Sequence, residues 1–520
     1  MSRAQTRCPL HRYAILGAFG AVAVGALFSM MGPLKAIIIA TGIVMMIGMI
    51  EWPIIGLFMV IMCSTCLQVY GDGNLTGLPI SGGKLFGVLT FGMWLMKVAR
   101  DRAPLTYSPQ MKALIWYVAA MTLVALLVHP SEPSDENGFM RFLQVGLVYW
   151  LVANIAGVDR RSLLFTCGAV TLGLALCSVI GTLEHFVPSF SIEFDDPALQ
   201  AGAVGAIIDR DSLEGVELRR ITGGLGDSNW LAVTLATILP LNIFWWRMAR
   251  GWMTRCLSLA AAGLQALALV LSYTRSGFLG LFVAVIYLTW RRVIPVSTIF
   301  KGGAIVVLVG LIWLPPGFME RVLSLNYLQN GSTPMREDLT GTALQFALEH
   351  PILGYGYGQF GVKFIETINT NVSSRIGAWG FELARAIEDG REEKHNIGAH
   401  NLYLEIMVEY GLVGLVPFVA FMLLAIADCR VATPRTDPEL ELLGLCLAAG
   451  LISFMVCGMF VHAKYLKILW IVAGLAAAYR RVAVTEGWAS LRKVRPMARV
   501  SVAGGISGAP DTTGASGARA

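Results

Sequence analysis

About fourteen apolar runs, each close to the length that crosses a bilayer, follow one another along this chain. Of its 520 residues, 56% are hydrophobic and only 14% are charged, which is more apolar surface than a water-soluble globule can bury. We therefore predict an all-α polytopic membrane protein with about 12–14 transmembrane helices. The runs lie near residues 13–31, 34–50, 53–70, 83–98, 111–129, 139–156, 162–184, 228–246, 256–273, 277–290, 298–315, 401–427, 440–461 and 466–480.

Basic residues fall on alternate loops between these runs, as the positive-inside tendency requires. The short outside loops, such as 71–82 and 130–138, hold almost no Lys or Arg. The first run is long for a signal peptide and a second run follows at once, so we interpret it as an uncleaved first helix. Both termini are then cytoplasmic. The inside loops hold Lys97, Arg100, Arg102, Arg160, Arg161, Arg247, Arg250, Arg255, Arg291, Arg292, Arg430 and Arg435.

Two predicted outside segments, 185–227 and 316–399, are long and carry basic residues. Long translocated loops escape the charge rule, so these residues need another explanation, and binding of an anion is one. We predict N-terminal transmembrane helices over 1–184, a first long periplasmic loop over 185–227 and central transmembrane helices over 228–315. A large periplasmic loop over 316–399, C-terminal transmembrane helices over 400–482 and a partly disordered cytoplasmic tail over 483–520 complete the chain.

His400-Asn401 stands where the second long segment re-enters an apolar run, ahead of Gly411 and Gly414. If this stretch is one helix, Gly411 lies about 20° and Gly414 about 40° around the axis from His400. One face would carry an imidazole above a glycine groove that lets a neighbouring helix approach closely. We predict a proton-handling group fixed at the membrane surface, with a polar cap as the alternative. His395 and His400 are too few ligands for zinc, so we predict no metal.

Arginines lie on the same predicted outside face as His400. Arg219 and Arg220 come just before the chain re-enters the membrane, Arg275 lies in a tight turn between two apolar runs, and Arg336 belongs to the second long segment. A guanidinium keeps its charge and binds phosphate through two parallel hydrogen bonds, so these arginines are candidate phosphate ligands. The alternatives are a loop with interfacial arginines at Arg220 and snorkelling to lipid phosphate at Arg275.

The second long segment contains an apolar periodicity and a glycine-rich turn. Leu339, Ala343, Phe346 and Ala347 recur at helical spacing, which predicts an amphipathic helix lying on the membrane. The run from 351 to 358 resembles a nucleotide-binding loop only superficially, because no strand precedes it. We predict that it forms a pocket wall, and we predict neither a nucleotide nor a nucleic-acid partner.

In this order and topology, these residues resemble the O-antigen ligase and polymerase superfamily. The ligase signature is His, then Asn, Ser or Gln, nine residues, Gly, two residues, and Gly, Thr or Tyr. His400, Asn401, Gly411 and Gly414 fit every fixed position. Further similar features, within residues 220–425, are the Pro351–Gly356 turn, the Thr274–Ser276 turn and the Gly224–Asn229 re-entry after Arg220.

The resemblance implies a metal-independent, inverting glycosyltransferase of the bacterial inner membrane that needs no cofactor. It would transfer a glycan from undecaprenyl diphosphate to an acceptor hydroxyl at the periplasmic face. His400 would be the general base, Arg220 and Arg275 would hold the diphosphate, and Arg336 would assist or stabilise its loop. The supporting residues would be Asn401, Gly411, Gly414 and Arg219, which competes with Arg220 for the same role.

The resemblance leaves the acceptor open. Lipid A core would define an O-antigen ligase, a growing glycan would define a repeat-unit polymerase, and a protein acceptor would define an O-oligosaccharyltransferase. The partners are then the undecaprenyl-diphosphate-linked glycan, one of these acceptors and membrane lipids. The chain departs from the family in its long segment before His400 and in its larger number of predicted spans. The rival classes are a transporter of lipid-linked or anionic solutes, with ionisable groups at mid-membrane, and a non-catalytic scaffold.

Overall fold

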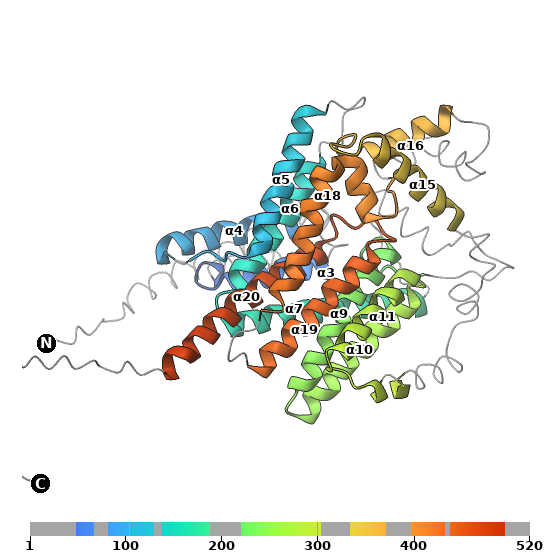
Figure 1. The fold of residues 1–520 in the computed structure, drawn as a ribbon. Helices are drawn as coiled ribbons and strands as arrows, with labels where there is room; N and C mark the ends of the chain where they lie inside the picture. Colours follow the sequence, from blue (N-terminus) through green and yellow to red (C-terminus); the bar gives the residue numbers. More distant parts are fainter. Residues whose placement is uncertain are drawn as a thin grey trace, which may run out of the picture.

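The computed structural model describes residues 48–66, 82–102, 104–128, 137–187, 220–298, 300–302, 333–370, 397–431 and 437–494. In these ranges the regular elements are helices, which pack side by side into a bundle with a smaller helical layer at one end (Figure 1). They are α3 (Pro53–Thr65), α4 (Gly82–Asp101), α5 (Pro109–Leu127), α6 (Asn137–Leu151) with the π-turn η2 (Val152–Ala156), α7 (Arg160–Phe186), α9 (Ser228–Met248), α10 (Trp252–Leu271), α11 (Arg275–Trp290), α15 (Thr333–Glu349), α16 (Gln359–Thr370), α18 (Leu402–Asp428), α19 (Pro438–Cys457) and α20 (Lys467–Val494).

Eight of the described helices are long and apolar enough to cross a membrane: α5, α6 with η2, α7, α9, α10, α18, α19 and α20. This confirms the prediction of an all-α, multi-pass membrane protein. Helices α3 and α11 are apolar but shorter. Helix α4 covers the run predicted near 83–98, but it contains Lys84, Lys97, Arg100 and Asp101 and is not among the eight. The run near 13–31 and most of the runs near 34–50 and 298–315 lie outside the described residues.

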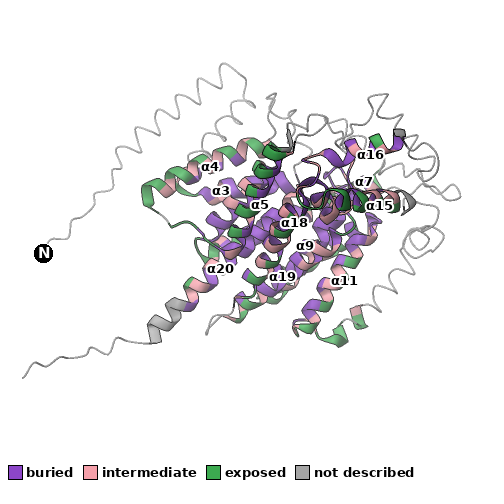
Figure 2. Cartoon of the chain, turned by 45° about the horizontal axis from the view of Figure 1, so that its top comes forward, coloured by how far each residue is buried: buried purple, intermediate pink, exposed green. Residues whose placement is uncertain are grey.

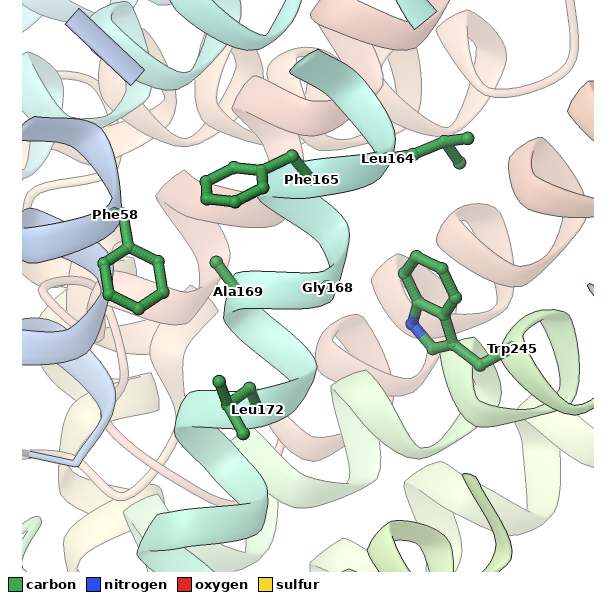
Figure 3. A pocket seen from close by; sticks show the side chains of 7 residues that line it. All are labelled: Phe58, Leu164, Phe165, Gly168, Ala169, Leu172 and Trp245. Carbon is green, nitrogen blue, oxygen red and sulfur yellow. The ribbon is translucent and has the colours of Figure 1, made fainter. Parts of the chain in front are cut away.

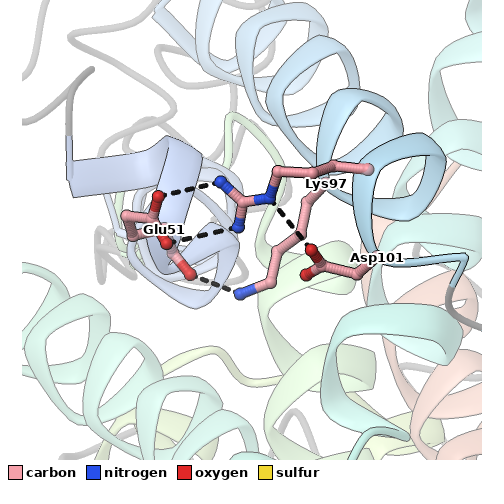
Figure 4. Close-up of polar contacts among 4 residues, drawn as sticks. Glu51, Lys97 and Asp101 are labelled. Carbon is pink, nitrogen blue, oxygen red and sulfur yellow. Dashed lines mark hydrogen bonds and ion pairs between the residues drawn. The ribbon is translucent and has the colours of Figure 1, made fainter. Parts of the chain in front are cut away.

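Helix α4 is tied to the start of α3 by a charged cluster at its C-terminal end (Figure 4). The Arg100 guanidinium donates to both Glu51 carboxylate oxygens, at 2.9 and 3.3 Å, and to Asp101 at 2.9 Å. The Lys97 ammonium donates to the Glu51 carbonyl. The paired side chains are about half exposed, so we assign this cluster a role in orienting α4 rather than a large stabilisation.

Helix α18 packs along α5 and against α19 and α20. Figure 2 shows its buried residues among those of α9 and α19, whereas α4 is largely exposed. Aromatic rings fill the space between helices. The ring centroids of Tyr117 and Phe418 are 5.3 Å apart, and Phe421 contacts both Tyr149 at 5.7 Å and Trp470 at 5.5 Å. Such pairs add about 0.5–1.5 kcal/mol each beyond the area that they bury.

Helix α18 is broken at Gly411, where φ is 59° and ψ is −162°. His400 precedes the helix and has a left-handed backbone, with φ of 49°. The prediction that His400, Gly411 and Gly414 share one helix face is therefore wrong, because the backbone is helical at neither His400 nor Gly411. A loop, rather than a neighbouring helix, packs against Gly411, since a Cβ there would lie 2.1 Å from the Ile352 carbonyl oxygen.

The turn formed by residues 351–356 fills this break. In a continuous helix, each N–H bonds to the carbonyl four residues earlier, and a break leaves two donors and two acceptors without partners. The turn supplies all four partners, so it acts as a substitute for the missing helical hydrogen bonds. The bonds run from Leu412 N–H to the Pro351 carbonyl (2.8 Å), from Val413 N–H to the Ile352 carbonyl (3.3 Å), from Tyr355 N–H to the Val408 carbonyl (2.8 Å) and from Gly356 N–H to the Glu409 carbonyl (3.0 Å).

Helices α15 and α16 form the layer at this end of the bundle (Figure 1). The predicted helix over 339–347 is present as part of α15, but its apolar face does not lie on the membrane. The face is buried in a separate core cluster between α15, α16 and the start of α18, because α16 and α18 offer matching apolar residues. The cluster consists of Leu339, Ala343, Phe346, Ala347, Phe360, Phe364, Ile365, Ile368, Ala399 and Val408.

Candidate functional site

Four loops meet beneath α15 and α16, at the end of the bundle where α18 begins. They are residues 220–227 before α9, 272–274 between α10 and α11, 397–401 before α18, and 458–466 between α19 and α20. Backbone hydrogen bonds link these loops to their neighbours, from Leu402 N–H to the Gly458 carbonyl (2.8 Å) and from Ile221 N–H to the Leu271 carbonyl (3.4 Å). These bonds hold the loops in two pairs, and a ring contact between Trp230 and His462 joins the pairs.

Arg220 connects the first two loops. Its Nε donates to the Ser272 carbonyl at 3.0 Å, and one terminal nitrogen donates to Thr274 Oγ1 at 3.0 Å and to Asn229 Oδ1 at 3.3 Å. The guanidinium is thereby held in one orientation between the N-terminal ends of α9 and α11. Arg219 lies outside the described residues.

A buried carboxylate anchors the glycine turn that follows Arg220. Glu184, at the end of α7, accepts hydrogen bonds from the N–H groups of Thr222 at 2.9 Å and Gly223 at 3.0 Å. Gly223 has φ of 59°, and a Cβ there would lie 3.0 Å from the Cys177 carbonyl oxygen, so the turn requires glycine. Glu184 was not predicted as a site residue, although an acidic residue near the end of an apolar run is unusual enough to indicate a structural or functional role.

Arg275 is the first residue of α11 and is partly exposed. The preceding Tyr273 has φ of 52°, a left-handed backbone that is uncommon for a tyrosine. The Cys457 thiol donates to the Ser276 carbonyl at 3.2 Å, which fixes this turn against α19. The predicted tight turn is thus present, and Thr274 brings it into contact with Arg220.

His400 lies directly before α18, and the adjacent Asn401 is the N-cap of that helix. The Asn401 side chain accepts from the N–H groups of Tyr403 at 3.0 Å and Leu404 at 3.1 Å. The left-handed backbone of His400 is a strained conformation of the kind that clusters at functional sites. Its pKa is held well below the ordinary value because burial disfavours the imidazolium, and the charges of His462 and Arg336 act in the same direction. The imidazole is therefore neutral at pH 7.

Arg336, in α15, is partly exposed and lies close enough to His400 for its positive charge to lower the pKa of that imidazole. The structure thus places Arg336 near His400, and Arg220 against the turn that carries Arg275, although these residues come from four distant parts of the sequence. Lys394 and His395 lie outside the described residues.

His462 and Trp230 belong to this site and were missed in the sequence. The His462 ring lies edge-on to His400, with 5.2 Å between ring centroids, and the Trp230 ring is 6.0 Å from His462. Gly398 packs so closely against His462 that a Cβ would lie 2.8 Å from its Cγ. The available signal was the short loop between the last two apolar runs, which contains both a histidine and a lysine. The other short loops on the predicted outside face hold almost no basic residues.

Lys464, in the same loop as His462, is buried between two carboxylates of α18. Its ammonium pairs with Glu405 at 2.8 Å and with Glu409 at 2.5 Å. Glu409 also accepts from the Gly358 N–H at 3.1 Å, which ties the cluster to the glycine-rich turn. Burial lowers the pKa of Lys464, but the Glu405 and Glu409 charges raise it by more, so the ammonium stays charged. The cluster joins α18, the loop after α19 and the glycine-rich turn.

An apolar pocket of 350 Å³ lies elsewhere, on the outer side of α7 (Figure 3). It is lined by Phe58, Phe165 and Trp245 among others. Trp245 follows Trp230 by fifteen residues of α9, so the pocket is about 22 Å along the bundle from the His400 site. It contains few polar atoms and cannot supply the chemistry of that site.

The described residues contain no group of three or more His, Cys, Asp or Glu side chains that could hold a metal ion. The site instead offers fixed guanidinium groups, the N-terminal ends of α9, α11 and α18, and a neutral imidazole. Guanidinium groups and helix N-termini attract anions, and a neutral imidazole accepts a proton. The arrangement is suited to a reaction in which an anion leaves and a proton is removed.

Comparison with known proteins supports this assignment. Residues 260–419, which run from α10 through the Arg275 turn, Arg336 and His400 into α18, match the protein family described as O-antigen ligase. A comparison with curated proteins finds no match to this chain. The family match confirms the resemblance found in the sequence, and residues 260–419 of this multi-pass membrane protein are similar to the O-antigen ligase family.

Proposed function

We propose that this protein transfers a glycan from undecaprenyl diphosphate to an acceptor hydroxyl. The observation that carries the proposal is that Arg220 and the Arg275 turn are connected through Trp230 and His462 to His400, whose pKa Arg336 lowers, at one end of an apolar bundle. A lipid-linked donor would keep its apolar chain in the bilayer and present its diphosphate at this end. The acceptor is lipid A core or a growing glycan, as in an O-antigen ligase or polymerase.

In this reaction His400 takes the proton of the acceptor hydroxyl as that oxygen attacks the anomeric carbon of the donor sugar. The bond between that carbon and the diphosphate oxygen breaks, and its electron pair leaves on the diphosphate. Attack opposite the leaving group inverts the configuration at the anomeric carbon. Arg220 and Arg275 stabilise the departing charge, which is a task for fixed cations in a site that excludes water, and no metal is required.

The low pKa of His400 fits this role once the donor is bound. A neutral imidazole is ready to accept a proton, but a base with a very low pKa is weak. The diphosphate brings negative charge close to His400 and Arg336, which raises the pKa of the imidazole toward neutrality. Donor binding would therefore strengthen the base when it is needed.

The proposed orientation places the His400 end in the periplasm, with the protein in the inner membrane of a bacterium and both termini in the cytoplasm. Residues 185–227 and 316–399 are then the two periplasmic loops, between the transmembrane parts 1–184, 228–315 and 400–482, and 483–520 is the cytoplasmic tail. The charge pattern of the loops supports this arrangement. A transporter would instead need ionisable groups at mid-membrane. The buried Glu405 and Glu409 lie within about 11 Å of the start of α18, so they are near one end of this helix and not at its middle.

The test is a strain with His400→Ala, compared with His350→Ala at an exposed histidine of the glycine-rich turn. Surface glycan and carrier-linked intermediates are measured in both. We expect loss of glycan product and accumulation of the carrier-linked donor with His400→Ala only. Long chains stranded on the carrier identify a ligase, and single repeats identify a polymerase. Normal surface glycan without accumulation would contradict the proposal.

A further inference from the structure

Two buried nitrogen atoms in the site have no hydrogen-bond partner among the described residues: Trp230 Nε1 and His462 Nδ1. A buried donor without a partner costs about 1–3 kcal/mol, so such atoms in a site point to a ligand that satisfies them. Neither residue was needed for the proton transfer or for holding the diphosphate. His462 lies next to His400, and Trp230 follows Asn229, which accepts a hydrogen bond from Arg220.

A series of contacts links these residues across the site. Arg220 donates to Asn229, and Trp230 is the next residue of α9. The Trp230 ring lies edge-on to the His462 ring, with 6.0 Å between centroids, and the His462 ring lies edge-on to the His400 ring at 5.2 Å. Trp230 and His462 therefore connect the part of α9 that Arg220 contacts with the His400 imidazole.

We propose that Trp230 and His462 form the subsite for the first sugar of the donor, the one attached to the diphosphate. This inference rests on the proposed function. In the transfer, the sugar lies between the leaving diphosphate, held by Arg220, and the acceptor hydroxyl, which gives its proton to His400. The contacts that connect the Arg220 region with His400 run through Trp230 and His462, the two residues of the proposed subsite.

The chemistry of the two side chains suits a sugar. Indole Nε1 donates a hydrogen bond, and imidazole Nδ1 donates or accepts one, so together they match the hydroxyl or acetamido groups of a pyranose ring. The rings also give the apolar surface that the C–H groups of a sugar contact. Gly398 packs against His462 and keeps its ring in place.

The test measures binding of two probes to the full-length protein in nanodiscs. One is farnesyl diphosphate, and the other is farnesyl diphosphate carrying a single N-acetylhexosamine or a single hexose. We expect the native protein to bind at least one of the sugar-bearing probes more tightly than the bare probe. Trp230→Phe and His462→Leu should each weaken binding of the sugar-bearing probe about three- to tenfold, as loss of one hydrogen bond would, and leave the bare probe unchanged.

Two further His462 variants separate a contact from a packing effect. His462→Asn places an amide group near the position of Nδ1 and should restore the sugar preference, whereas His462→Gln, whose longer side chain places its amide near the position of Nε2, should not. Trp252→Phe and His350→Leu, at exposed positions outside the site, are the matched controls. Unchanged binding of the bare probe shows that each variant is folded.

The outcomes distinguish this inference from the proposed function. If the native protein binds neither probe, both the proposed function and the subsite are contradicted. If the native protein binds all probes equally, or if the variants keep the sugar preference, the subsite is contradicted but the diphosphate site is not. Loss of the preference in Trp230→Phe and His462→Leu, with recovery in His462→Asn, supports the subsite.

Discussion

Gly411 lies directly against the backbone of Ile352, and a Cβ at Gly411 would meet the Ile352 carbonyl oxygen at 2.1 Å. This contact joins the break in α18 to the turn that replaces its hydrogen bonds. The same break places Glu409 where it accepts from the Gly358 N–H and pairs with Lys464. Gly411 therefore affects the site because it allows the turn to pack against α18. It does not provide a surface for a neighbouring helix.

Gly411→Ala should therefore destabilise the protein by at least about 1–3 kcal/mol, because alanine is strained at this backbone conformation and collides with Ile352. The measurement is thermal unfolding of the purified protein in nanodiscs. Gly263→Ala in α10 is the control, since a Cβ there meets nothing within 4 Å and alanine favours a helix. Equal unfolding temperatures for the two variants would contradict the structural role of Gly411.

The sequence predicted the long apolar helices well, because a bilayer demands about 20 apolar residues in a row and few other arrangements satisfy the backbone. Topology also predicted Arg220, Arg275, Arg336 and His400 on one outside face, and the structure places Arg220 against the Arg275 turn and Arg336 near His400. The sequence did not reveal the break at Gly411, because a glycine within an apolar run gives no sign of a helix break whose partners come from a loop about 55–60 residues earlier.

His462 and Trp230 escaped prediction for a related reason. Their importance depends on which loops meet in space, and the spacing along the chain does not reveal that. Lys464 had a signal in the charge pattern, but only the structure shows that Glu405 and Glu409 neutralise it.

Arg336→Gln should raise the pKa of His400, because the positive charge of Arg336 lowers that pKa in the native protein. A base must be neutral to act, so activity falls as the pH drops through its pKa. In the profile of kcat/KM against pH, which reports the free enzyme, the acid limb should move to higher pH. Arg336→Lys keeps the charge and should leave the limb in place. An unshifted limb in Arg336→Gln would show that the two groups do not interact.

Arg220→Lys should reduce kcat/KM for glycan transfer about tenfold or more, although the charge is kept. A lysine ammonium cannot bond at once to the Ser272 carbonyl, Thr274 and Asn229 while presenting a flat fork to a diphosphate. Arg275→Lys should cause a similar loss. Arg255→Lys, at the opposite end of α10, is the control and should retain activity. Full activity of Arg220→Lys and Arg275→Lys would rule out bidentate diphosphate binding.

Lys464→Met should be strongly destabilising, by about 3–5 kcal/mol, because it leaves Glu405 and Glu409 buried without a counter-charge. The cost arises from the uncompensated carboxylates rather than from the lost ammonium. Adding Glu405→Gln and Glu409→Gln to Lys464→Met should therefore recover much of the stability in thermal unfolding, since amides tolerate burial better than carboxylates. If the triple variant unfolds at the same temperature as Lys464→Met alone, the lysine acts through packing and not through charge.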